Sequence, residues 1–151
     1  MKTLLITSFL FLNGFIFSQK ADLNTVKTFW DANIYEIIIL DQEGIEKHTY
    51  FPVEGSWGYI LNLEDPESTT DEDFTHNLKE IFTEEVRVAL RNKTYNDLVH
   101  HTDENGELNF IVQVITTTQM EGSGEVMESM MILYFKKFEG EWKLFQIELA
   151  G

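Results

Sequence analysis

The sequence predicts an α+β fold in which N-terminal helices pack on one side of a curved antiparallel sheet. Two observations carry this prediction. In the first part of the chain, apolar residues recur three and four positions apart, which is the period of an amphipathic helix. The last third contains three runs rich in Ile, Val, Thr and Phe, separated by short turns, which is typical of an antiparallel strand meander.

The first predicted helix begins soon after residue 22. Its apolar face consists of Leu23, Val26, Trp30 and Ile34. The four apolar residues 37–40 fit either a further helical turn or a buried strand. Phe51 is expected to be extended because Pro52 follows it. Residues 55–61 then predict a short strand, entered through a glycine-rich bend.

Two more helices are indicated by their capping residues. Thr70 lies three residues before Asp73 and forms a variant capping box for a helix that starts at Asp71. Thr83 is expected to be the N-cap of a helix over residues 84–91. These local signals, with the apolar face of Phe74, Leu78, Ile81 and Phe82 on the first piece, predict either two helices in succession or one kinked helix.

The meander is expected to follow as three strands, over residues 108–120, 126–138 and 142–149. In the third strand, the residues expected on the buried face are Phe145, Ile147 and Leu149. The other face of that strand should be largely in contact with water.

Residues 1–18 have the layout of a cleavable secretory signal. Lys2 is followed by an almost wholly apolar stretch, and small Ser18 precedes polar Gln19. The apolar stretch is shorter than the roughly 20 residues that cross a bilayer. We therefore expect cleavage after Ser18 and export of residues 19–151, as one soluble domain, to a periplasm or the exterior.

The charge of the chain excludes some classes of partner. It has 26 Asp and Glu residues against 11 Lys and Arg, and its formal net charge of −15 becomes one unit more negative once Lys2 is removed. Binding to nucleic acid depends largely on Lys and Arg, and anionic lipid surfaces also repel such a chain. Because there is no Cys, disulfides and thiolate metal sites are excluded too.

Three segments, together with the order of the elements, resemble one known superfamily. They are Thr28–Ala32, Tyr50–Trp57 and Gly140–Ile147. They resemble the nuclear transport factor two-like, or cone-shaped α+β, superfamily, which includes ketosteroid isomerase, scytalone dehydratase and polyketide cyclases. The resemblance implies a conical pocket between the sheet and the helices. The carboxylate base of the isomerases and the His and Asp pair of the dehydratases cannot be placed residue by residue on this chain.

Four aromatic residues are the candidates for lining such a pocket: Trp30, Trp57, Tyr59 and Tyr134. Each has an apolar body with a polar tip, which suits a small-molecule site. Ordinary core packing explains each of them nearly as well.

The densest group of possible metal ligands is His100, His101, Asp103, Glu104 and Glu107. Aligned as a calcium-binding loop, this segment places His101 and Val112 where carboxylates are required, so the match fails. Adjacent histidines on an extended chain also point to opposite sides. The acidic stretch over residues 65–73 is interpreted as a solvated loop that leads into a helix. We therefore expect no metal site and no cofactor.

The sequence leaves three functions open. We favour a non-enzymatic exported domain that binds a small apolar ligand or a protein partner. The first alternative is an isomerase or lyase with a buried carboxylate beside a Tyr. The second is a homodimer formed through the outer face of the sheet, where alternation leaves Ile111, Ile115, Met127 and Met131, or their opposites, partly uncovered.

Overall fold

The computed structural model describes residues 24–101, 108–119 and 126–150, except positions 60, 62, 64, 65 and 67. The predicted signal and its cleavage site at Ser18 and Gln19 lie outside this set. Within the described part, no helix is both long enough and apolar enough to span a membrane.

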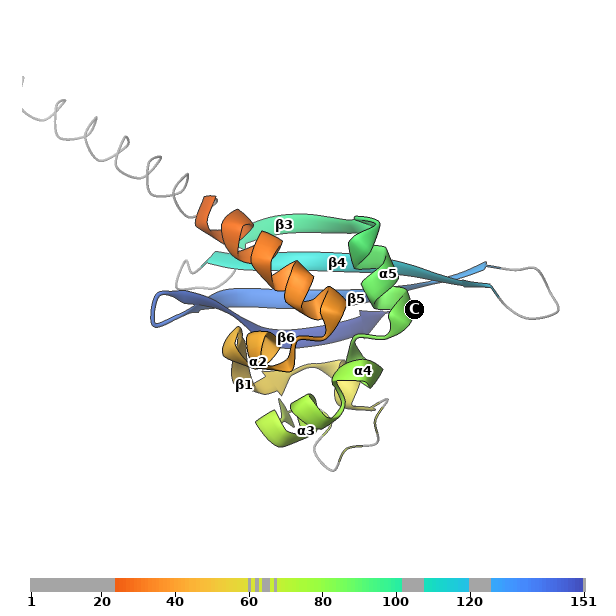
Figure 1. The fold of residues 1–151 in the computed structure, drawn as a ribbon, viewed down its shortest axis with the longest axis horizontal. Helices are drawn as coiled ribbons and strands as arrows, with labels where there is room; N and C mark the ends of the chain where they lie inside the picture. The colour runs from red at the N-terminus through yellow and green to blue at the C-terminus, as the bar shows by residue number, and fades with distance from the viewer. Residues whose placement is uncertain are drawn as a thin grey trace, which may run out of the picture.

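Six strands form one curved sheet, and the helices lie against one of its faces (Figure 1). The order of the strands is β2-β1-β6-β5-β4-β3, and every neighbouring pair is antiparallel except β1 and β6. The strands are β1 Thr49–Glu54, β2 Ser68–Thr69, β3 Tyr95–His101, β4 Leu108–Gln119, β5 Val126–Phe138 and β6 Glu141–Ala150. The predicted fold class is confirmed, and the three meander strands match their predicted ranges closely.

The first helix covers residues 24–39 in the described part and runs obliquely across the sheet (Figure 1). Residues 37–39 extend it, which decides the open choice between helix and strand. The remaining helices are α2 Gln42–Lys47, the 3-10 helix η1 Ser56–Tyr59, α3 Asp71–His76, α4 Leu78–Ile81 and α5 Glu84–Arg91. We call the face that the helices cover the inner face of the sheet, and the opposite one the outer face.

Both predicted caps are confirmed. The Thr70 Oγ1 accepts a hydrogen bond from the Asp73 backbone N–H and donates one to the Asp73 carboxylate at 2.7 Å. The Thr83 Oγ1 accepts from the backbone N–H of Val86. Each cap satisfies a backbone donor that the first helical turn leaves unpaired.

The strand predicted over residues 55–61 is wrong, because residues 56–59 form η1 instead. Gly55 has a φ of 120°, a conformation that turns the chain away from β1. Gly58 is pressed against the backbone of Pro66, where a side chain would not fit. The two glycines therefore fold the chain into a compact turn at the edge of the sheet.

The placement of Phe145 on the buried face is also wrong. Tyr134 pairs with Gln146, whereas the next residue, Phe135, pairs with Leu144, so Phe145 is an extra residue between two pairs. This bulge shifts the alternation of β6 by one position. Phe145 consequently lies with Tyr134, their ring centroids 6.4 Å apart, while Leu144 and Ile147 are buried.

Aromatic side chains fill the middle of the space between the first helix and the sheet. The ring of Trp30 meets those of Tyr95, Phe110 and Phe135 edge to face, with centroids 5.6 to 6.0 Å apart. Phe29 packs on Phe135 in the same way. The central part of the cone is therefore packed with aromatic side chains.

Candidate functional site

A cleft of about 640 Å³ lies at one end of the domain, between η1, the helices α4 and α5, and the ends of β4, β5 and β6. Its apolar lining consists of Trp57, Leu61, Ile81, Val86, Met127, Met130, Met131, Leu149 and Ala150. Its polar lining consists of Ser56, Tyr59, Glu80, Thr83, Thr116 and Ser129. A concave, mainly apolar wall with a few polar groups is typical of a small-molecule site.

Two small side chains make room for this cleft. Thr116 on β4 and Ser129 on β5 are directly paired, and the Thr116 hydroxyl donates to the Ser129 carbonyl at 3.3 Å. Further along the same two strands, the inner face carries larger buried residues such as Val114 and Leu133. The change from bulky to small residues at one cross-strand pair leaves volume unfilled beneath η1.

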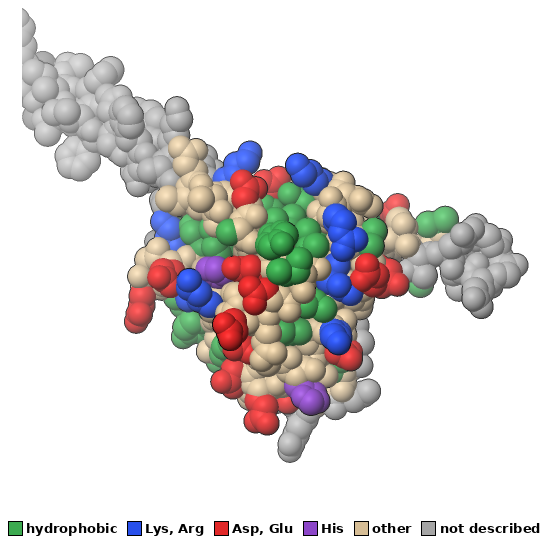
Figure 2. All heavy atoms as spheres, viewed as in Figure 1, with side chains coloured by type: hydrophobic (Ala, Val, Ile, Leu, Met, Phe, Trp, Pro, Cys, Tyr) green, Lys and Arg blue, Asp and Glu red, His purple; other side chains and the backbone are tan. Residues whose placement is uncertain are grey.

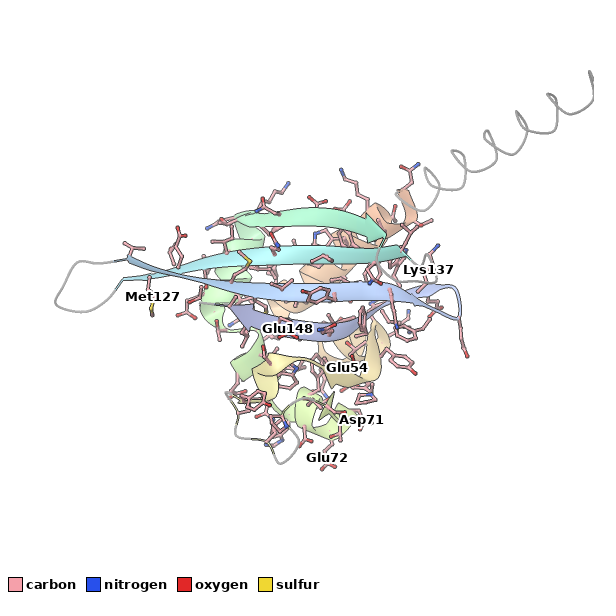
Figure 3. The ribbon with its side chains drawn as sticks, turned by 180° about the vertical axis from the view of Figure 1, so that it is seen from behind. Glu54, Asp71, Glu72, Met127, Lys137 and Glu148 are labelled. Carbon is pink, nitrogen blue, oxygen red and sulfur yellow. The ribbon has the colours of Figure 1, made fainter. Side chains whose placement is uncertain are left out.

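A hydrogen-bonded group holds η1 onto β6 beside the cleft. The Ser56 backbone N–H donates to the Glu148 carboxylate at 3.2 Å, and the Leu149 N–H donates to the Ser56 Oγ at 3.1 Å. The Gln146 amide donates to the other oxygen of Glu148 at 2.9 Å. Figure 3 shows Glu148 on the outer side of the sheet, on the strand next to the one that carries Glu54. The wall of the cleft that η1 forms is thus anchored through Glu148.

The same contacts lower the pKa of Glu148 below its ordinary value. The Ser56 hydroxyl contributes most, partial burial opposes the shift, and the Gln146 amide and the Ser56 backbone N–H lower the pKa further. A carboxyl whose pKa is lower in the folded state stabilises that state above the unfolded pKa. This stabilisation is lost as the pH falls through the folded value.

Ser56→Ala is therefore expected to destabilise the domain more at pH 7 than at pH 3. At neutral pH the variant loses a hydrogen bond to a carboxylate, and this loss becomes smaller as the pH falls through the lowered pKa of Glu148, because the protonated carboxyl gains less from the Ser56 hydroxyl. Urea unfolding at both pH values measures the difference. An equal loss of free energy at the two pH values would contradict this role of Glu148.

The structure brings together two of the four predicted pocket residues. Trp57 and Tyr59, both on η1, line the cleft. Trp57 is buried and its ring meets that of Phe74 edge to face, whereas Tyr59 is 56% exposed. Trp30 lies in the aromatic core, and Tyr134 lies on the outer face beside Phe145. Trp30 and Tyr134 are therefore separate from the cleft.

The outer face carries a continuous group of partly buried apolar residues, and no helix is drawn over β3 to β6 there in Figure 3. These residues are Ile111, Ile115, Ile132, Tyr134, Phe138 and Phe145. Tyr50 stacks on Phe138 with ring centroids 3.6 Å apart. Lys136 holds its ammonium group 4.8 Å from the ring centroids of both Phe138 and Phe145. Met131 instead is buried on the inner face.

The helix side is more mixed in character. Figure 2 shows hydrophobic side chains there among Lys, Arg, Asp and Glu. Three large apolar residues of the first helix and α5 are exposed: Tyr35, Ile39 and Val88. His48 Nδ1 lies 2.8 Å from Glu36 on the first helix, and this pair joins that helix to the start of β1.

The possible metal ligands are only partly within the described residues. His100 and His101 are in β3, opposite Asn109 and Leu108, while Asp103, Glu104 and Glu107 lie outside the described set. Among the residues that the structure describes, no three His, Asp or Glu side chains come together as a metal site would require. Asp73 takes part in the cap of α3, as the interpretation of the acidic stretch predicted.

No family model matches the sequence, and no curated protein matches it. The fold, in contrast, is shared with solved structures. A scytalone dehydratase-like protein from Novosphingobium aromaticivorans superposes with a TM-score of 0.52 at 11% identity, covering 87% of this chain and 85% of its own. A protein designated Rd1NTF2_05 superposes with a TM-score of 0.52 at 12% identity, covering 85% of this chain and 99% of its own.

The hexachlorocyclohexane dehydrochlorinase LinA-type3 from Novosphingobium barchaimii is a third similar structure. It has a TM-score of 0.51 at 8% identity, and the match covers 87% of each chain. At these identities the similarity concerns the fold alone. The predicted resemblance is confirmed at that level: the chain has the nuclear transport factor two-like cone fold.

Proposed function

We propose that this protein is an exported binding domain that holds a small apolar ligand in the cleft between η1, α4, α5 and the sheet. The observation that supports the proposal best is the lining of the cleft, in which apolar side chains of β5, β6, η1, α4 and α5 surround a volume of about 640 Å³. That volume lies in the range of small-molecule pockets. Export rests on the signal pattern of residues 1–18.

A binding role is preferred to the enzymatic alternative because of where the carboxylates lie. An isomerase or lyase of the expected type needs a carboxylate deep in the cone beside a Tyr. In the described part of the chain the buried polar residues are Asn33, Thr49 and Thr69, with no Asp or Glu among them. Glu80, the carboxylate that lines the cleft, is exposed on α4.

Filling the cleft is expected to weaken binding strongly. The neutral fluorescent probe N-phenyl-1-naphthylamine should bind the purified protein, and its emission should rise as it leaves water. Ser129→Trp places a large ring in the cleft, so we expect at least a tenfold weaker affinity, which corresponds to about 1.4 kcal/mol.

Ile132→Trp is the matched control, because it adds the same ring on the same strand but on the outer face. The control should bind the probe as the unaltered protein does, and far-ultraviolet circular dichroism verifies that both variants are folded. Undiminished binding by Ser129→Trp, or no binding by the unaltered protein, would overturn the proposal.

A second candidate function is a homodimer through the outer face, favoured by the apolar group around Ile132 and Tyr134. Strands present side chains alternately to the two faces, and contiguous apolar surface on the uncovered one is typical of an interaction site. Few carboxylates interrupt this group in a strongly acidic chain, so two copies would meet there with little repulsion. Sedimentation velocity is expected to show a dimer, and a monomer at every concentration would contradict it.

A further inference from the structure

The charged side chain that lines the cleft is a carboxylate. Among the lining residues that the structure describes, Glu80 is the only carboxylate and none is Lys, Arg or His. Arg87 is on the neighbouring α5, but its guanidinium is paired with Glu84 at 2.5 Å and donates to the Phe82 carbonyl. The cleft therefore has a negative charge that no lining cation neutralises.

Two sequence segments that adjoin lining residues are also negatively charged. The stretch 60–67, which contains Leu61, and the stretch 120–125, which precedes Met127, together have five Asp and Glu residues and no Lys, Arg or His. The chain as a whole has a net charge of −15, and a strongly acidic protein raises the local concentration of cationic ligands and repels anionic ones.

The positions of Glu80 and Tyr59 place the polar end of a ligand. Both side chains line the cleft and both are exposed, so they lie on its solvent side. Ile81, the residue after Glu80, is buried at the inner wall together with Val86. A Tyr ring attracts an ammonium group through its π-electrons, in addition to the charge attraction of a carboxylate.

From this arrangement we propose that the ligand class of the cleft is a cationic amphiphile. Its apolar body lies against Ile81, Val86 and Leu149, and its ammonium group lies on the solvent side beside Glu80 and the Tyr59 ring. This inference rests on the proposed function, because it specifies the ligand for the same cleft.

Three competitors with the same alkyl chain test the inference: decyltrimethylammonium, 1-decanol and decanoate. Each displaces N-phenyl-1-naphthylamine from the purified protein at a concentration where it forms no micelles. We expect the affinity order cation, alcohol, anion, with the cation about two- to fivefold tighter than the alcohol, as for an ion pair at an exposed site. Added salt should reduce this preference.

Glu80→Gln separates a local contact from the general attraction of an acidic protein. It should remove most of the preference for the cation and leave the affinity for 1-decanol unchanged. Glu139→Gln is the matched control, since it removes one exposed carboxylate at the β5–β6 turn, at the opposite end of β5 from Met127. This variant should keep the preference.

The possible results distinguish the two proposals. Equal affinity for the cation and the alcohol, or a preference that survives in Glu80→Gln, would overturn the cationic class while 1-decanol binding still supports the apolar cleft. If the fluorescent probe and all three competitors fail to bind, the proposed function itself is wrong, and the inference falls with it.

Discussion

Gly55→Ala is expected to lower the free energy of unfolding by about 3 kcal/mol or more, because two penalties add at this position. The φ of Gly55 is 120°, a backbone conformation that residues with a Cβ rarely adopt. In addition, a Cβ at this position would overlap the backbone carbonyl of Ile147. That carbonyl belongs to a central strand, so it has little freedom to move aside. Urea denaturation measures the loss.

Gly140→Ala is the control that separates the two penalties. Gly140 also has a positive φ, of 88°, but nothing lies within 4 Å of the position that its Cβ would take. Only the backbone strain of about 1–2 kcal/mol is expected there. If both variants lose the same free energy, contact between η1 and β6 is not what requires Gly55.

Phe135→Ala is expected to cost about 3–5 kcal/mol, the usual penalty for truncating a buried Phe. Phe135 is fully buried on the inner face and contacts the rings of Phe29, Trp30 and Phe110. Its removal leaves a cavity at the point where the first helix meets the sheet. The lost contacts belong to two different elements, the first helix and β4, so little local collapse can refill the space.

Tyr134→Ala is the control, because it truncates an aromatic side chain on the other face of the sheet. Tyr134 precedes Phe135 on β5 but points outward and is only partly buried. We expect it to cost about 1 kcal/mol, as is usual for an average substitution. Urea denaturation of both variants measures the two losses in free energy of unfolding. Similar losses for the two would mean that the outer face is as tightly packed as the core, which would contradict the uncovered surface described above.

Local chemistry made much of the fold predictable. Thr70 and Thr83 act on backbone groups within three residues, so their capping roles can be read without knowing the rest of the chain. The long strands β4 and β5 are similarly evident from their Ile, Val and Thr content.

Two features depend on partners that are distant in sequence. Strand β3 (Tyr95–His101) was not predicted as part of the sheet, because it is a short edge strand whose polar sequence pairs only with β4. The outward position of Phe145 follows from a register shift between β5 and β6. A bulge is set by how two strands align, and the composition of one strand does not reveal it.

The candidate site was predictable only in part, because some of its residues depend on how the strands align. Trp57 and Tyr59 were selected by residue type, and both line the cleft. The residues that leave space, Thr116 and Ser129, have no signal of their own. They become informative only when the register pairs them on the inner face, next to the bulkier pair of Val114 and Met131. Glu80 was overlooked because a single Glu on a short helix is ordinary.

The order of the strands has a consequence for how the molecule forms. β6, the last strand in sequence, lies between β1 and β5, and it pairs Thr49 with Leu144 across most of the described chain. Until β6 is in place, the pair β1–β2 and the meander β3–β4–β5 share no strand contact. Pairing between such distant segments is slow, because a long loop must close before any contact rewards it. The sheet can therefore be completed only after β6 has been synthesised and has left the ribosome.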